Sequence, residues 1–382
     1  MRRRVVITGL GVVAPLGVGV ESFWDALTAG GSGARAVELD GVGVFPAFPA
    51  DDGDAARERF GARDARRMDR VGRLAAVAGA LALEDAGGLP VAADRAGVAI
   101  GCIHGGAATL DEAYRALLDR GADRVGPLTV PLSLVNSPAA ATARVLGLRG
   151  PSSAVATACA AGADAIGGAL EAIRAGRAEV MLAGGAEAAL SPLVVAGYAR
   201  MGALSRGHRA PDAASRPFDR GRDGFVIGEG AGILVLEERD HALARGARIH
   251  AELAGYGATC DAGHLTDPDP VGEGATRALR LAMADAGVAP AEVGYVNAHA
   301  TSTPAGDVAE AHALRAAGLG DVPVSSTKSA HGHERLDAAG GAERVAVRGL
   351  GRRDGHIAET GGAQRVRLGH VARRGRGRVR VD

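Results

Sequence analysis

Strand-like and helix-like segments alternate along most of this chain, and the alternation limits the fold more than any other feature of the sequence. Buried strands are expected at 97–102 and 230–237, and the Ala-rich segment 70–86 has the spacing of a helix. Regular alternation predicts an α/β protein with buried sheets. Further strands are expected at 153–156, 179–182, 249–258 and 293–298, and further helices from about 21 and at 109–120, 159–175 and 272–286.

Two segments with similar openings suggest an internal duplication. Val5–Val13 and Ala251–Thr259 each run as a strand into Gly-x-Gly. The chain of 382 residues is long enough for two domains. We expect an N-terminal half at 1–245, a C-terminal half at 246–343 and a divergent Arg/Gly-rich tail at 344–382.

The first residues admit two other interpretations, which the sequence disfavours. Arg2-Arg3-Arg4 before an apolar stretch has the outline of a secretory signal, but Val5-Val6-Ile7-Thr8 is β-branched and predicts a strand. Gly9–Ala14 matches the relaxed dinucleotide pattern G-x-G-x-x-A. That pattern needs a helix beginning at the glycines, and Pro15 and Gly17 argue against one. We therefore expect neither a leader nor a nucleotide here.

Charge and cysteine content exclude several classes of function. Lys and Arg together number 44, as do Asp and Glu, so no global charge favours nucleic acid or a membrane as partner. No apolar run approaches the ~20 residues of a membrane span. Three cysteines cannot form a disulfide framework, which predicts a reducing, cytoplasmic location. The tail alone is strongly basic, with eleven Arg against three acidic residues.

The segment Val155-Ala156-Thr157-Ala158-Cys159 places a thiol where a strand gives way to a helix. A cysteine at a helix N-terminus lies near the positive end of the macrodipole, which favours the thiolate. Small neighbours leave room for a substrate. The alternative is a cysteine buried in a core helix. Cys102 and Cys260 lack this context and are interpreted as structural.

Two later segments carry imidazoles and a cation. His299 ends a predicted strand before Thr301 and Thr303, a setting suited to polarising a carbonyl, although an incidental His in a capping loop is the alternative. Lys328 is the only lysine of the chain and lies just before His331 and His333. We expect no metal, because His331, His333 and Glu334 are too few ligands.

Several motifs together resemble the elongating β-ketoacyl-acyl-carrier-protein synthases of the thiolase-like superfamily. The resemblance runs from Arg4 to about Lys328 and keeps the family's order. It rests on Thr157-Ala158-Cys159, Ala183-Gly184-Gly185-Ala186-Glu187-Ala188, Ser215-Arg216-Pro217-Phe218-Asp219, Asp223-Gly224-Phe225-Val226, Gly228-Glu229-Gly230-Ala231-Gly232 and Asn297-Ala298-His299.

The resemblance implies a duplicated core of five layers, α-β-α-β-α, assembled as a homodimer. It implies a decarboxylative Claisen condensation in fatty acid biosynthesis. Cys159 would carry an acyl group from acyl carrier protein, and His299 and His333 would hold the malonyl thioester and stabilise its enolate. Lys328 would supply a nearby positive charge. Thr301 and Thr303 match positions that contact the phosphopantetheine arm, which arrives on the carrier, so no cofactor of the enzyme itself is implied.

The sequence departs from the family pattern at its end. Ala300 replaces a glycine after the first His, at a cost of about 1 kcal/mol if its φ is positive. Three of the residues 334–337 are charged, and the closing Phe-Gly-Phe-Gly-Gly loop, which supplies an oxyanion-hole N–H in the family, is absent. No apolar strand is expected in the tail. Our hypothesis is that the tail is read in a shifted frame, or has otherwise degenerated, from about residue 330; a basic surface for an acidic carrier is the alternative.

These departures keep two other functions open. The same site residues would serve a polyketide ketosynthase. A catalytically impaired homologue or a pairing subunit is the rival from outside the enzymes, although family pairing subunits lack the cysteine that this chain keeps at Cys159.

Overall fold

The computed structural model describes residues 2–207, 209–333, 345–349, 351–353 and 356–358. Its strands are β1 Val5–Ala14, β2 Gly17–Val18, β3 Arg35–Leu39, β4 Gly43–Phe48, β5 Ala96–Gly101, β6 Ser152–Val155, β7 Val180–Ala188, β8 Ile227–Glu238, β9 Ala251–Tyr256, β10 Val296–Asn297, β11 Val324–Ser325, β12 Val345–Gly349, β13 Gly351–Arg353 and β14 His356–Ala358. Its α-helices are α1 Val20–Thr28, α2 Ala55–Ala65, α3 Arg70–Asp85, α4 Ala107–Arg120, α5 Thr129–Ser133, α6 Ser137–Leu146, α7 Ala161–Arg174, α8 Pro192–Arg200, α9 Arg239–Ala244, α10 Glu273–Ala286, α11 Pro304–Ala316 and α12 Lys328–His331.

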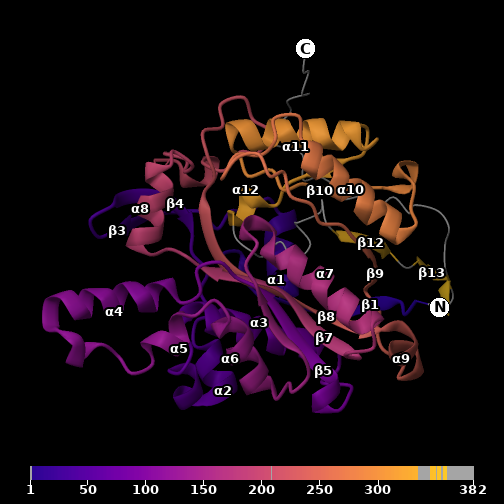
Figure 1. Cartoon of the computed structure of the whole chain (residues 1–382), viewed down its shortest axis with the longest axis horizontal. Coiled ribbons are helices and arrows are strands. Elements are labelled where there is room, and N and C mark those ends of the chain that lie inside the picture. The colour runs from indigo at the N-terminus through magenta and orange to yellow at the C-terminus, as the bar shows by residue number, and fades with distance from the viewer. Residues whose placement is uncertain (1, 208, 334–344, 350, 354–355, 359–382) are drawn as a thin grey trace.

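One large mixed sheet organises the molecule, as the alternation predicts (Figure 1). Its main path runs β12-β9-β1-β8-β7-β5-β6, with β5 parallel to β6 and β7, and β8 antiparallel to β1 and β7. Successive residues of a strand point to opposite faces. Thus Val98 and Ile100 of β5 join the core that contains α3, whereas Ala99 joins the core that contains α7. The chain is therefore an α/β protein with helices on both faces of this sheet.

The Gly-x-Gly segments of the two halves share one packing role. A Cβ atom at Gly9 or Gly11 would lie 2.1 or 1.9 Å from a carbonyl oxygen of α3, and one at Gly255 or Gly257 would lie 2.5 or 2.4 Å from a carbonyl oxygen of α10. Glycine is needed wherever a helix backbone approaches a strand this closely. Gly9 and Gly11 thus lie within the continuous strand β1, not at a helix start, so the dinucleotide interpretation has no structural support.

The C-terminal half differs most from the predicted elements. The strand expected at 293–298 is only Val296–Asn297, because the chain leaves the β10–β11 pair to build the His299 loop. Helices α10 and α11 pack on this pair around Leu279 and Leu314. The expectation of no strand in the tail was wrong for β12, whose antiparallel pairing with β9 extends the large sheet. Residues 334–344 and 359–382, which carry most of the anomalous segment, lie outside the described part.

No helix of the described residues is both long enough and apolar enough to cross a membrane.

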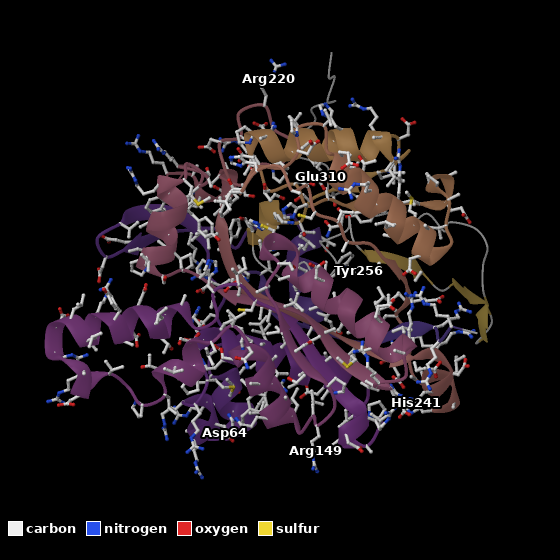
Figure 2. All side chains as sticks on the ribbon, viewed as in Figure 1. Asp64, Arg149, Arg220, His241, Tyr256 and Glu310 are labelled. Atoms are coloured by element: carbon white, nitrogen blue, oxygen red, sulfur yellow. The ribbon has the colours of Figure 1, made fainter. Side chains whose placement is uncertain are left out.

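Glu237, near the end of β8, is completely buried and joins three elements through its carboxylate. Thr8 of β1 donates to it at 2.9 Å, and Arg245 donates at 2.7 and 2.8 Å. His241 of α9, labelled in Figure 2, approaches it to 2.6 Å. Burial raises the pKa of Glu237, but the hydrogen bonds from Arg245, His241 and Thr8 outweigh burial and leave the pKa below its ordinary value.

This network predicts a pH-dependent contribution to stability. A carboxyl whose pKa is lower in the folded chain than in the unfolded chain, where it is about 4.3, stabilises the fold above that pH and loses this effect as the pH falls through the folded value. We expect Glu237→Gln to lower the free energy of unfolding by about 3 kcal/mol at neutral pH, and by progressively less in acid. Denaturant unfolding of both proteins across this range tests it. A difference that stays constant with pH would contradict the assignment.

Candidate active site

Cys159 lies on a turn between a sheet strand and a helix. Strand β6 ends at Val155, a 3₁₀ turn covers Ala158–Ala160, and α7 begins at Ala161. Ala158 has φ 49°, a left-handed conformation that is unusual for a residue with a side chain. The turn leaves Cys159 exposed in the single chain, beside the N-terminus of α7. The thiol is therefore available to a substrate and is not a buried core residue.

His333 is the imidazole nearest to the thiol, with Nε2 at 3.2 Å from Sγ of Cys159. Its backbone is fixed to the start of β8, since its N–H donates to Val226 O at 2.8 Å and its carbonyl accepts from Gly228 N at 3.2 Å. The ring of Phe225 packs edge-on against the His333 ring, with centroids 5.2 Å apart. The sheet therefore sets the position of His333.

His299 faces the same point from another loop. Its ring centroid lies 5.3 Å from that of His333, at an interplanar angle of 81°. The loop is held by Glu310 of α11, labelled in Figure 2, whose two carboxylate oxygens each accept a backbone N–H at 2.6 Å, one from His299 and one from Ala300. Ala300 has a positive φ of 26°, so the strain expected where alanine replaces glycine is present. Glu310 offsets that strain by accepting the N–H groups of two consecutive residues of the turn.

Lys328 begins α12 and is only 1% exposed. Its carbonyl accepts a hydrogen bond from Ser215 at 2.8 Å. Burial raises the pKa of Asp307 of α11 above its ordinary value, and the positive charge of Lys328 opposes that rise. Lys328 thus lies buried close to Asp307, five residues before His333 in the chain.

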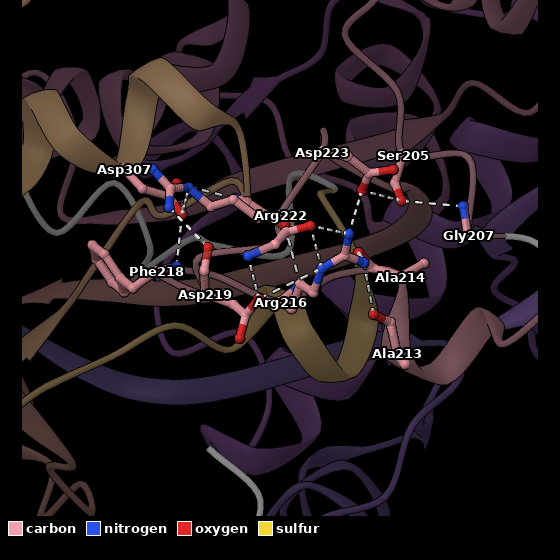
Figure 3. Close-up of polar contacts among 12 residues, drawn as sticks. Ser205, Gly207, Ala213, Ala214, Arg216, Phe218, Asp219, Arg222, Asp223 and Asp307 are labelled. Carbon is pink, nitrogen blue, oxygen red and sulfur yellow. Dashed lines mark hydrogen bonds and ion pairs between the residues drawn. The ribbon is translucent and has the colours of Figure 1, made fainter. Parts of the chain in front are cut away.

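Thr301 and Thr303 lie side by side, with their hydroxyl oxygens 3.0 Å apart, and Thr303 also caps α11 through Gly306 N at 3.2 Å. Figure 3 shows how Asp307 ties this loop to the segment before β8. Asp307 accepts the N–H of Phe218 at 2.7 Å and lies 3.2 Å from Arg222. Burial raises the pKa of Asp307 more than these partners and Lys328 lower it.

The structure therefore gathers three of the four predicted catalytic residues at one point. The sulfur of Cys159 and one ring nitrogen each of His299 and His333 all lie within 4.8 Å of one another. Two residues that hold the His299 loop, Asp307 and Glu310, were not among the predicted site residues; in the sequence they are only two acidic residues near the start of a helix. Their spacing of three, which places both on one side of α11, was the available signal for a role in holding the loop.

Within the described part of the chain, the trio of Cys159, His299 and His333 is also the one group with the donor types and spacing of a metal site.

Neither Cys102 nor Cys260 belongs to the trio. Cys102 is fully buried, with its sulfur 3.8 Å from Oε1 of Glu187. Cys260 is exposed in the loop between β9 and α10.

Comparison with known proteins gives a consistent result along the chain. Residues 2–242 match the Beta-ketoacyl synthase N-terminal domain, and residues 250–350 match the Beta-ketoacyl synthase C-terminal domain. A protein named 3-oxoacyl-[acyl-carrier-protein] synthase 2 from Vibrio cholerae is 47% identical over 353 residues, covering 90% of this chain and 85% of the relative. Its namesake from Synechocystis is 44% identical over 365 residues, covering 91% and 85%. A solved type II polyketide ketosynthase, in complex with its acyl-carrier protein and bound to a hexaketide, aligns with TM-score 0.77 and 37% identity, covering 88% of this chain and 84% of that chain.

Proposed function

This chain belongs to the beta-ketoacyl synthase family, and on that premise we propose that it is an elongating 3-oxoacyl-[acyl-carrier-protein] synthase of fatty acid biosynthesis. The observation that carries the proposal is the convergence of Cys159, His299 and His333 within 4.8 Å. The curated relatives with that name, at 44% and 47% identity, support the substrate class.

The first half-reaction loads the enzyme. The sulfur of Cys159 attacks the carbonyl carbon of an acyl group held as a thioester on the carrier. A new carbon–sulfur bond forms, the bond to the phosphopantetheine sulfur breaks, and that sulfur leaves as a thiol with the proton from Cys159. His333, at 3.2 Å from Sγ, is placed to hold this proton in transit.

The second half-reaction forms the carbon–carbon bond. The malonyl thioester loses carbon dioxide, and the electron pair of the broken bond becomes an enolate. N–H donors of His299 and His333 stabilise the negative charge that develops on the thioester oxygen. The enolate carbon attacks the acyl group on Cys159, the carbon–sulfur bond breaks, and a 3-oxoacyl product forms on the carrier. The departing Cys159 thiolate takes up a proton from solvent, which restores the starting thiol. Lys328 contributes a buried positive charge close to Asp307, on the helix that follows the His299 loop.

The partner of the proposed reaction is acyl carrier protein, as in the related ketosynthase complex. Thr301 and Thr303 present adjacent hydroxyl groups that can bind the phosphopantetheine arm. The enzyme needs no cofactor of its own in this scheme, and it needs Cys159 reduced, which fits a cytoplasmic location.

We also propose that the chain forms a homodimer. Helices α4 and α5 project from the body in Figure 1 and expose large apolar side chains at Leu110, Tyr114, Leu117, Leu118 and Val130. Strand β6 ends the large sheet and has an open edge there. Both features are expected of a surface covered by a second copy. Light scattering should give twice the 38.2 kDa of one chain. A monomer at micromolar concentration would contradict this.

A condensation assay tests the proposal. The purified chain, an acyl-carrier and a malonyl-carrier should yield carbon dioxide and 3-oxoacyl-carrier, unchanged by a metal chelator. A pairing subunit would yield neither.

The polyketide ketosynthase remains the second candidate because of the solved relative bound to a hexaketide. It predicts faster extension of carriers bearing unreduced 3-oxo chains than of carriers bearing saturated chains, and the fatty acid proposal predicts the reverse.

A further inference from the structure

Asp164, on the first turn of α7, uses both oxygens of its carboxylate to join two distant segments. Oδ1 accepts a hydrogen bond from the Tyr256 hydroxyl at 2.7 Å, and Oδ2 accepts one from the Thr157 hydroxyl. Thr157 lies two residues before Cys159. Tyr256, labelled in Figure 2, is the last residue of β9. The three side chains form one continuous link from the C-terminal half to the nucleophile turn, which we call the Thr157–Asp164–Tyr256 link.

Tyr256 is itself held at two points. A Cβ atom at Gly167 of α7 would lie 2.5 Å from the Tyr256 ring, so the ring packs directly on the helix backbone. The backbone N–H of Tyr256 donates to Asp285 at 3.0 Å, and Asp285 is bound by Arg174 at 2.8 Å. A hydroxyl held in this way reaches Asp164 at a defined position. The link is therefore anchored in packed structure at its far end.

The other end of the link is the nucleophile turn, which is exposed and has a strained backbone. Residues 157–159 are exposed, and Ala158 between Thr157 and Cys159 has φ 49°. A left-handed conformation is unfavourable for a residue with a side chain, so this turn persists only where its surroundings favour it. Thr157 precedes the 3₁₀ turn without capping it by a side-chain hydrogen bond, so its hydroxyl is directed to Asp164 instead.

We propose that Thr157, Asp164 and Tyr256 are positioning residues that hold the nucleophile turn so that the sulfur of Cys159 stays within hydrogen-bond distance of His333. None of the three takes part in the bond changes. The inference rests on the proposed function for its kinetic consequence. A displacement of about 1 Å between reacting groups can cost up to 10²-fold in rate. Loss of one hydrogen bond from the link should therefore lower kcat while leaving carrier binding largely intact.

Three conservative variants test the link. Thr157→Val keeps the shape and removes the donor, whereas Thr157→Ser keeps the donor. Tyr256→Phe removes only the hydroxyl and leaves the ring on Gly167. We expect Thr157→Val and Tyr256→Phe each to lower kcat about 10-fold with KM for acyl-carrier within about twofold, and Thr157→Ser to stay near the parent. The double variant should lose much less than the product of the single losses, because both changes break one link.

A second readout does not depend on the carrier substrates. The rate of Cys159 alkylation by iodoacetamide at neutral pH reports the environment of the sulfur alone. We expect it to fall in Thr157→Val and Tyr256→Phe and to recover in Thr157→Ser. Parent-like kcat and alkylation in Thr157→Val, or equal losses in Val and Ser variants, would overturn the inference. A parent that alkylates normally but never condenses would instead count against the proposed function.

Discussion

Cys159→Ala should abolish condensation, with a fall in kcat of about 10⁴-fold or more. No other group can replace the missing sulfur as nucleophile. In other enzymes, removal of the nucleophile lowers kcat by this factor or more. The assay is formation of 3-oxoacyl-carrier from acyl- and malonyl-carrier. Condensation at more than about one hundredth of the parent rate would contradict the assignment of Cys159 as nucleophile.

The same variant carries its own control. Decarboxylation of malonyl-carrier is assigned to His299 and His333, which do not form the thioester, so Cys159→Ala should still release carbon dioxide. Cys260→Ala is the matched variant, because Cys260 is also exposed but lies outside the site. It should condense at the parent rate.

His333→Ala should lower condensation about 10²–10³-fold, since it removes one of two donors to the developing oxyanion. It should also slow acyl loading, because Nε2 of His333 lies 3.2 Å from the sulfur. His299→Ala should impair decarboxylation to a similar degree but leave loading closer to the parent. Separate assays of the two half-reactions measure this difference. Equal effects of both variants on loading would contradict the division of roles.

A half-buried histidine outside the site supplies the control for these variants. His312 lies on α11 near Glu310, and its Nδ1 approaches Pro270 O at 3.2 Å, outside the catalytic trio. His312→Ala should retain parent activity in both half-reactions.

The sequence predicted helices and strands best where the local residue pattern and the burial of the segment favour the same structure. The helix at 70–86 appears as α3, Arg70–Asp85, because its Ala-rich spacing agrees with its burial. Strand β7 extends to Ala188, well past the predicted 182, because buried glycines that are typical of turns here permit close strand pairing with β8. The antiparallel pairing of β9 with β1 joins residues about 250 positions apart and has no local signal.

The site shows the same division. Cys159 and His299 were predicted because each lies at the end of a predicted strand, and His333 because it follows the only lysine of the chain. The contacts that hold them come from residues with common local roles: Glu310 is an acidic residue in a helix, and Tyr256 ends a strand. Only the fold reveals that Glu310 binds the His299 loop and that Tyr256 reaches Asp164.

Mass spectrometry of the chain after incubation with a loaded acyl-carrier tests the central claim most directly. The peptide containing Cys159 should gain the mass of the acyl group and lose it when malonyl-carrier is added, while peptides containing Cys102 and Cys260 keep their masses. An acyl group found on either of those cysteines instead, or no acyl group on the chain at all, would contradict the account.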